Sequence, residues 1–184
     1  MAEMRTPLPV KLFIGLLSPE PALFDICAEI LSAEYGPLDF ASEVMPWDKT
    51  DYYRNEMGPA IFRKFLFFEQ LMDPGKLPSI KKFTSSLEKN FSVPAGPPVR
   101  RRINLDPGYV TEAKVVLATA KDFAHRMYIG ENIYAEVTLR YSLKEKSFTA
   151  HEYTYPDFRT ATYLALFNRV RESLRAELHR KSKK

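Results

Sequence analysis

The chain has 184 residues, of which 45% are hydrophobic, 13% aromatic and 27% charged. This length is typical of one domain, and the apolar content suffices for a packed core, which excludes a disordered segment. A single cysteine excludes an internal disulfide and a thiolate zinc cage. We therefore expect a reducing compartment and a cytoplasmic location.

The formal net charge of +4 is unevenly distributed along the sequence. Most of the excess lies in residues 168–184, whereas the rest of the chain is close to neutral. We expect the basic tail, about 179–184, to be the solvated end of a helix, where cations complement the helix dipole. Nucleic acid is consequently an unlikely partner on charge grounds, and no run approaches the roughly 20 apolar residues of a membrane span.

The first half of the chain predicts the order strand, helix, strand, strand, helix, strand. The apolar run from Val10 to Leu17 has the length of a buried strand, and Pro21 precedes apolar residues at helical spacing. Alternation then predicts strands over 38–45 and 61–68, a helix over 77–91 and a strand over 100–106. This order is that of a ferredoxin-like split βαβ arrangement.

The second half predicts mostly antiparallel strands followed by one long helix. Strands are expected over 115–121, 124–129, 133–141 and 148–153, with a turn at Gly130-Glu131-Asn132 and a helix over 157–180. The whole chain, 1–184, is therefore predicted to be a single α+β domain with a ferredoxin-like start and a long C-terminal helix.

Polar side chains gather at the predicted strand over 100–106. Alternation would place Arg100, Arg102, Asn104 and Asp106 on one face. The sequence Asp106-Pro107-Gly108 is typical of a turn. We consider either a plain turn or an anion-holding loop at this position.

Two further stretches carry candidate chemistry. Lys121, His125 and Arg126 combine two cations with an imidazole, which titrates near neutral pH. In the strand over 133–141 every second residue is polar, so one face would carry Tyr134, Glu136, Thr138 and Arg140. That face is either a solvated surface or the polar floor of a site.

The region from Trp47 to Glu56 has more charged and aromatic residues than a connection needs. Asp48 and Asp51 are its candidate ligand-binding carboxylates. Alternatively, Trp47 to Tyr53 is an aromatic loop that docks a protein partner, because aromatic residues are common interface anchors.

Metal and nucleotide motifs are sparse. The three histidines are too far apart for a local ligand motif, although carboxylates brought together by folding could hold a magnesium ion. The sequence has no G-x-x-x-x-G-K-S/T loop, which excludes a P-loop nucleotide site.

Several blocks resemble a bacterial family named only as domain of unknown function 4416. They are Asn104 to Tyr109, Val116 to Asp122, His125-Arg126, Tyr134 to Leu139 and Thr154 to Asp157. The resemblance implies an uncharacterised bacterial protein. Members are sometimes labelled GTP-binding, but Asp48-Lys49-Thr50-Asp51 only approximates the guanine-reading N-K-x-D pattern.

These observations lead to one main hypothesis. We expect the protein to bind a small phosphorylated or carboxylated ligand in a polar cleft over the sheet, and the sequence leaves open whether it also transforms that ligand as an enzyme. Asp106, His125 and Glu136 are the candidate catalytic groups. The candidate ligand-binding residues are Arg102, Asn104, Lys121, Arg126, Thr138, Arg140, Asp48 and Asp51. A protein-interaction module built on the Trp47–Tyr53 loop is the alternative.

Overall fold

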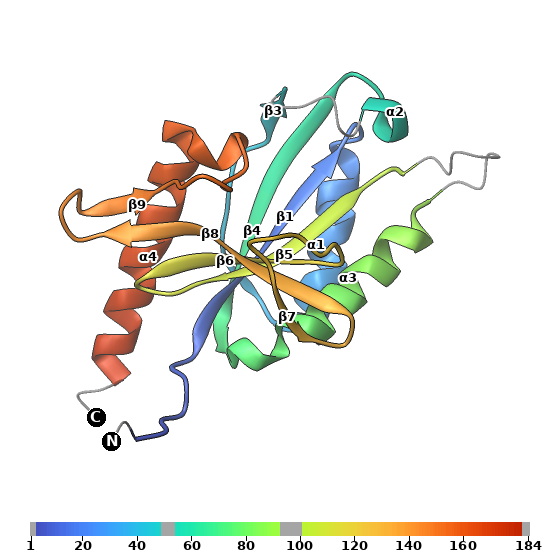
Figure 1. Ribbon diagram of the computed structural model, residues 1–184. Helices are drawn as coiled ribbons and strands as arrows, with labels where there is room; N and C mark the ends of the chain where they lie inside the picture. Colours follow the sequence, from blue (N-terminus) through green and yellow to red (C-terminus); the bar gives the residue numbers. More distant parts are fainter. Residues whose placement is uncertain (1–2, 49–53, 93–100, 182–184) are drawn as a thin grey trace.

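A computed structural model describes residues 3–48, 54–92 and 101–181 (Figure 1). Within these ranges the strands form one nine-stranded antiparallel sheet in the order β2-β4-β1-β5-β6-β8-β7, with β3 paired to β4 and β9 to β8. The strands are β1 (Val10–Ser18), β2 (Leu38–Ala41), β3 (Met45–Trp47), β4 (Ile61–Met72), β5 (Asn104–Val110), β6 (Lys114–Thr119), β7 (Met127–Gly130), β8 (Ile133–Ser142) and β9 (Ser147–Thr149).

Three long helices and several short turns complete the described chain. The α-helices are α1 (Ala22–Tyr35), the single-turn α2 (Arg54–Met57), α3 (Leu77–Asn90) and α4 (Ala161–Lys181); the 3-10 turns are η1 (Pro74–Lys76) and η2 (Asp157–Arg159). The four strands β2-β4-β1-β5, joined through α1 and α3, have the order and antiparallel pairing of a ferredoxin-like sheet. The predicted α+β class and split βαβ start are confirmed.

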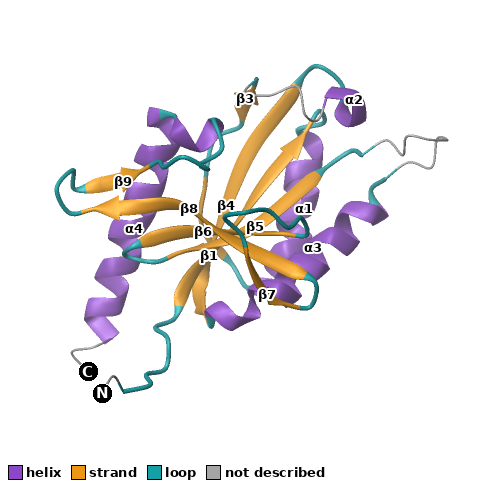
Figure 2. Cartoon of the chain, in the orientation of Figure 1, coloured by secondary structure: helices purple, strands orange, loops and turns teal. Residues whose placement is uncertain are grey.

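Helices cover both faces of the sheet (Figure 2). Leu12, Ile14 and Leu16 of β1 pack in one cluster with side chains of α1 and α3. Phe13, on the opposite face of the same strand, packs with Phe167 of α4. Because each face of β1 has its own apolar cover, the strand is buried along its whole length, as its continuous apolar sequence predicts.

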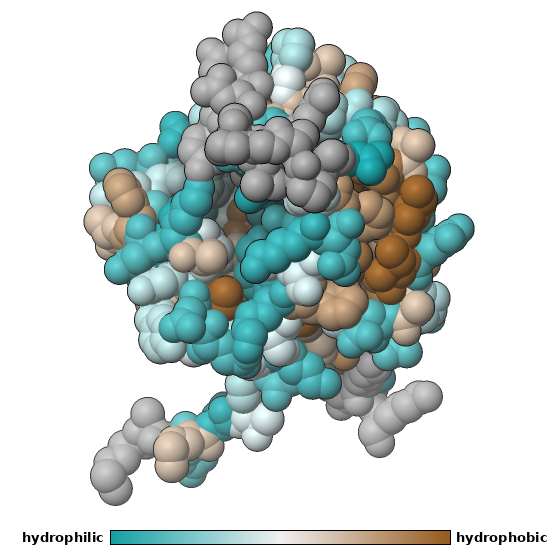
Figure 3. Space-filling model, turned by 90° about the vertical axis from the view of Figure 1, so that its right-hand side faces the viewer, coloured by the Kyte–Doolittle hydropathy of each residue, from teal (hydrophilic) through white to brown (hydrophobic). Residues whose placement is uncertain are grey.

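The outside of the molecule is largely hydrophilic on the side shown in Figure 3, with a hydrophobic area near one edge. This distribution agrees with a sheet whose apolar residues are covered by helices. Among the described residues, no helix is both long enough and apolar enough to cross a membrane.

The prediction for residues 100–108 is wrong in its boundaries. The strand β5 runs through Pro107 and Gly108, which pair with Ile14 and Phe13 of β1 and do not form a turn. Its pairing with β6 covers only Gly108 to Val110. Pro107 has no amide hydrogen to donate. It lies just before the residues of β5 that pair with β6, at a position where the sheet needs no hydrogen bond from its backbone nitrogen. Arg102 therefore lies before the strand, and Arg100 lies outside the described residues.

The single polar face predicted for residues 133–141 is also wrong. The pairing of β6 with β8 shifts between Val115 and Val116, so that Thr138 is an extra residue on β8. Such a bulge reverses the alternation of side chains beyond it. Ala135 accordingly packs in the cluster that contains Leu77 of α3, whereas Leu139 packs in the cluster under α4. Glu136 and Arg140 thus lie in different surroundings.

Other boundaries shift by a few residues. The predicted strand over 38–45 is split into β2 and β3, and β6 ends at Thr119, before Lys121. Both β7 and β9 are shorter than expected, so His125 and Arg126 lie in the loop before β7. The long C-terminal helix begins at Ala161 after η2. These shifts place Lys121, His125 and Arg126 in the loop between β6 and β7, whereas the candidates of β5 and β8 stay in strands.

Candidate functional site

A pocket of about 730 Å³ lies where β5 and β6 separate. Beyond Leu117, β6 pairs only with β8 and no longer with β5. Asn104 and Asp106 line the pocket from β5, and Leu117 to Lys121 line it from the end of β6. Its volume lies within the range of small-molecule sites. The remaining walls come from Trp47, Arg63, Lys81, Ser85, Glu88, Arg101, Arg126, Glu136, Tyr155, Asp157 and Phe158.

Side chains of α3 replace the hydrogen bonds that β5 loses when β6 departs. Glu88 Oε1 accepts a 2.7 Å hydrogen bond from the Leu105 amide, and Lys81 Nζ donates a 2.8 Å bond to the Leu105 carbonyl. Burial raises the pKa of Glu88, and the nearby Lys81 ammonium and the Leu105 amide partly offset this effect. Where the two strands separate, these side chains therefore satisfy both backbone groups of Leu105.

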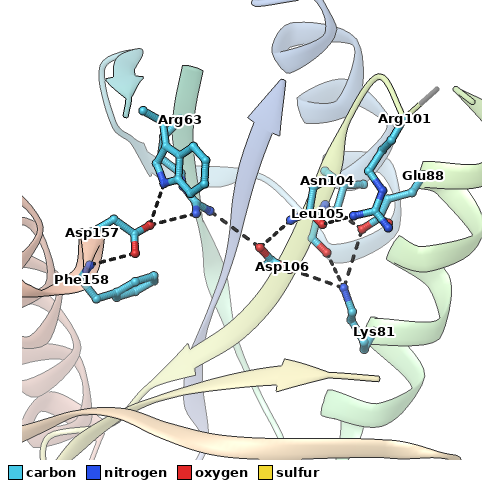
Figure 4. Close-up of polar contacts among 10 residues, drawn as sticks. Arg63, Lys81, Glu88, Arg101, Asn104, Leu105, Asp106, Asp157 and Phe158 are labelled. Carbon is cyan, nitrogen blue, oxygen red and sulfur yellow. Dashed lines mark hydrogen bonds and ion pairs between the residues drawn. The ribbon is translucent and has the colours of Figure 1, made fainter. Parts of the chain in front are cut away.

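Asp106 lies at the centre of this wall, between cations from both faces of the sheet (Figure 4). Its Oδ1 is 3.6 Å from Lys81 Nζ, and its Oδ2 is 3.9 Å from Arg63 Nη1. Asn104 Nδ2 donates a 2.6 Å hydrogen bond to the same Oδ2. The Asp106 side chain remains 28% exposed, so its oxygens are accessible from the pocket.

A second buried ion pair forms the wall nearest α4. Asp157 Oδ2 accepts hydrogen bonds from Trp47 Nε1 at 3.0 Å and from Arg63 Nη2 at 3.1 Å. Arg63 passes over Gly15, where a Cβ atom would lie only 2.8 Å from Arg63 Nη1. The Arg63 guanidinium can therefore lie at this position because Gly15 has no side chain.

The third charged cluster is built around Glu136, which is only 2% exposed. Its Oε2 accepts a 2.8 Å hydrogen bond from Arg126 Nε and lies 3.1 Å from His125 Nε2. Arg126 also donates to the Lys121 carbonyl at 3.0 Å and to the Tyr155 hydroxyl at 2.6 Å. These three acceptors fix the orientation of Arg126 at the pocket wall.

His125 lies behind Glu136 and does not line the pocket. A carboxylate accepts hydrogen bonds and does not donate them, so we assign to His125 the tautomer that has its proton on Nε2. Nδ1 is buried and has no hydrogen-bond partner among the described residues. The ring stacks on Tyr153 with centroids 4.4 Å apart and planes 7° apart. His125 can therefore affect an occupant only through Glu136.

Two pKa values are shifted at this end of the pocket. Burial, and then the nearby Arg126 charge, lowers the pKa of Lys121. Burial, followed by the negative charge of Glu136, raises the pKa of Tyr155 to about 12. Tyr155 therefore stays a neutral phenol, whereas Lys121 and Arg126 form a pair of like charges that an anion would relieve.

The structure brings five of the candidate residues together at the pocket: Asn104, Asp106, Lys121, Arg126 and Glu136. Arg102 instead forms a surface ion pair with Glu20, with its Nε 2.8 Å from Glu20 Oε1. Thr138 is fully buried at the bulge, and Arg140 is exposed.

The candidate carboxylates of the region after Trp47 are not part of this wall. Asp48 is exposed and does not line the pocket, and Asp51 lies outside the described residues. Trp47 itself is only 8% exposed and contributes to the pocket. It does not present its ring to a partner at the surface.

Several pocket residues had no place in the sequence prediction. Lys81 and Glu88 are seven residues apart and share the inner side of α3 with Ile80 and Leu87, a spacing that could have drawn attention to them. Arg63 and the adjacent Lys64 interrupt the apolar residues at the start of β4, which is a comparable signal.

The described pocket residues do not fit the magnesium ion that the sequence left open. In the part of the chain that the structure describes, no three His, Cys, Asp or Glu side chains converge. The two central carboxylates are held by cations, Asp106 by Lys81 and Glu136 by Arg126. Each of these carboxylates is therefore already paired with a cation, which disfavours the binding of a metal ion.

Comparison with known proteins gives a family and no activity. The family model DUF4416, described as a domain of unknown function, matches residues 8–174, so the chain belongs to this family. No curated protein and no solved structure shows a significant match.

Proposed function

We propose that this member of the DUF4416 family binds a small anionic ligand, phosphorylated or carboxylated, in the pocket between β5, β6 and α3. The family description assigns no activity, so the proposal is based on the pocket. One observation carries the proposal: five cationic side chains line a single ligand-sized pocket. They are Arg63, Lys81, Arg101, Lys121 and Arg126. Arginine and lysine are the side chains that compensate the desolvation of an anion.

The anionic group of the ligand binds at the Lys121 and Arg126 end. Arg126 is held there by Glu136 and Tyr155, so little of its side-chain entropy remains to be lost on binding. Burial and then the nearby Arg126 charge lower the pKa of Lys121, which supports this position because a bound anion would offset the repulsion between the two cations. Trp47 and Phe158 provide apolar walls for the body of the ligand.

If the ligand is also transformed, the protein supplies two proton acceptors. Asp106 and Glu136 line the pocket, and each carboxylate contacts a cationic side chain there. His125 holds Glu136 from behind and is a positioning residue, since it does not reach the pocket. Thus Asp106 and Glu136 are the candidate general bases.

Thermal unfolding with a ligand panel tests the proposal. Nucleotides, sugar phosphates and acidic metabolites are each added to the full chain, with and without magnesium. A ligand at 100 times its Kd stabilises a protein by about 2.7 kcal/mol, which raises the Tm measurably. If no member of the panel raises the Tm, the pocket is not an anion site.

A matched pair of variants then locates the binding. Lys121→Ala removes a pocket cation, whereas Lys144→Ala removes an exposed lysine in the turn after β8. We expect Lys121→Ala to weaken binding roughly tenfold, the equivalent of one charged hydrogen bond, and Lys144→Ala to leave it unchanged. Equal effects of the two variants would place the ligand elsewhere.

The alternative interaction module is not favoured by the position of Trp47. Its indole is buried and donates a hydrogen bond to Asp157, so it is not available as a surface anchor. The tyrosines of the predicted loop, Tyr52 and Tyr53, lie outside the described residues.

A further inference from the structure

The pocket is almost balanced in charge. Four carboxylates line it together with the five cations named above: Glu88, Asp106, Glu136 and Asp157. The described lining therefore carries a formal charge of +1. Because a desolvated site is most favourable when its occupant neutralises it, this balance matches one negative charge.

The carboxylates are interleaved with the cations and do not form a separate patch. Asp157 lies 3.1 Å from Arg63, Glu136 lies 2.8 Å from Arg126, and Glu88 lies 3.7 Å from Lys81. An anionic group placed on any of these cations would also be within a few ångströms of a carboxylate. Each additional negative charge on a ligand would therefore meet a like charge, which disfavours it.

A polyphosphate usually meets this difficulty with a bound cation. Among the described residues no cluster of three potential metal ligands is available to hold one. The sequence also lacks the G-x-x-x-x-G-K-S/T loop, whose backbone amides would hold the phosphates. Both observations separate this site from those that bind a nucleoside triphosphate.

The pocket carboxylates are better matched by hydrogen-bond donors on the ligand than by further negative charge. Ionised Asp106 and Glu136 can only accept hydrogen bonds. The Asp106 side chain is 28% exposed and lies on the pocket wall, so it can accept from a hydroxyl group. A ligand rich in hydroxyls satisfies these oxygens without adding charge.

We propose that the occupant is a small hydroxylated monocarboxylate, chemically a sugar acid, and not a nucleoside triphosphate or another polyanion. The carboxylate binds at Lys121 and Arg126, and the hydroxyl groups donate to Asp106 and Glu136. This inference rests on the proposed function and narrows its ligand to one chemical class.

The test compares ligands that share a body and differ in charge. Isothermal titration calorimetry on the full chain measures gluconate against 6-phosphogluconate, glycerate against 3-phosphoglycerate, and GTP with and without magnesium. We expect at least one monocarboxylate to bind roughly tenfold or more tightly than its phosphorylated counterpart and than GTP. Tighter binding of the phosphorylated member of each pair, or of GTP, would overturn the inference while leaving an anion site in place. If none of these probes binds and the wider panel also fails, the proposed function itself falls.

Variants that change the charge of the pocket provide a second, independent test of the ligand class. Asp106→Asn keeps the shape of the side chain and an oxygen that can accept from Asn104, but raises the lining charge by one. We expect the ratio of affinities for 6-phosphogluconate over gluconate to rise about tenfold, and Glu136→Gln to act in the same direction. Thermal unfolding without ligand checks that each variant is folded. An unchanged ratio in a folded variant contradicts the inference.

Discussion

Glu88 of α3 accepts a 2.7 Å hydrogen bond from the main-chain amide of Leu105 in β5. A side chain thereby takes the position that a neighbouring strand occupies elsewhere in the sheet, since β6 pairs only with the later residues of β5. Lys81 donates the corresponding hydrogen bond to the Leu105 carbonyl. These two residues thus satisfy the amide and the carbonyl of Leu105 where the pocket opens inside the sheet.

The first prediction concerns the contact between Glu88 and Leu105. Glu88→Ala leaves a fully buried amide without an acceptor, which costs about 1–3 kcal/mol of the free energy of unfolding. Glu88→Gln keeps an acceptor oxygen and should cost less than about 1 kcal/mol at neutral pH. Urea denaturation monitored by circular dichroism measures both. Equal losses in the two variants would mean that the hydrogen bond to Leu105 contributes little.

The second prediction is a pH dependence that has the same origin. Burial raises the pKa of Glu88 in the folded protein above its ordinary value of 4.5, so the folded state holds this proton more tightly than the unfolded state. The resulting stabilisation is complete below pH 4.5 and is lost as the pH rises through the folded pKa. Relative to Glu88→Gln, the wild-type free energy of unfolding should therefore fall between pH 4 and pH 7. A constant difference between the two proteins contradicts this expectation.

The third prediction concerns Gly108, where β5 joins β6. A Cβ atom at this position would lie 2.3 Å from the Val116 carbonyl oxygen and 2.5 Å from the Phe13 ring. Because backbone is one of the obstacles, Gly108→Ala should lower the free energy of unfolding by about 3 kcal/mol. Gly75→Ala is the control, since its Cβ would meet only the Asp73 side chain, at 3.2 Å. Similar denaturation midpoints for the two variants would show that β5 can move away from β6 at little cost.

The fourth prediction addresses the charge on Lys121 in ligand binding. Burial and the nearby Arg126 lower the pKa of Lys121 below its ordinary value of 10.5. An anion held by this ammonium group should bind more weakly as the pH rises through that lowered pKa, and the loss should level off near the roughly tenfold expected for Lys121→Ala. Lys121→Arg keeps its charge throughout, so calorimetry with gluconate between pH 7 and pH 10 should show a much flatter profile for this variant. Parallel profiles would remove Lys121 from the anion site.

Much of the fold follows from local sequence patterns. β1 is buried on both faces, so its sequence is a continuous apolar run, and this run predicts the strand. α1 is buried along one stripe, so its apolar residues recur at helical spacing and predict the helix. The order of the elements then predicts the ferredoxin-like arrangement. The assignment of residues 1–184 to a single domain remains a prediction.

The errors arise where pairing between distant strands overrides local preference. Pro107 and Gly108 are typical of a turn, but the pairing of β5 with β1 keeps them extended. The bulge at Thr138 depends on the register between β6 and β8, which no local pattern of β8 encodes. The same limit applies to the site, because Lys81 reaches Asp106 only through the packing of α3 on β5.

The position of Trp47 has a practical consequence. It is the only tryptophan of the chain, and its indole borders the pocket while donating a hydrogen bond to Asp157. Indole fluorescence responds to changes in nearby charge and hydration, so an arriving molecule should alter the emission spectrum of the unmodified protein. The molecule thus contains its own optical reporter, and candidate compounds can be screened without attaching a dye.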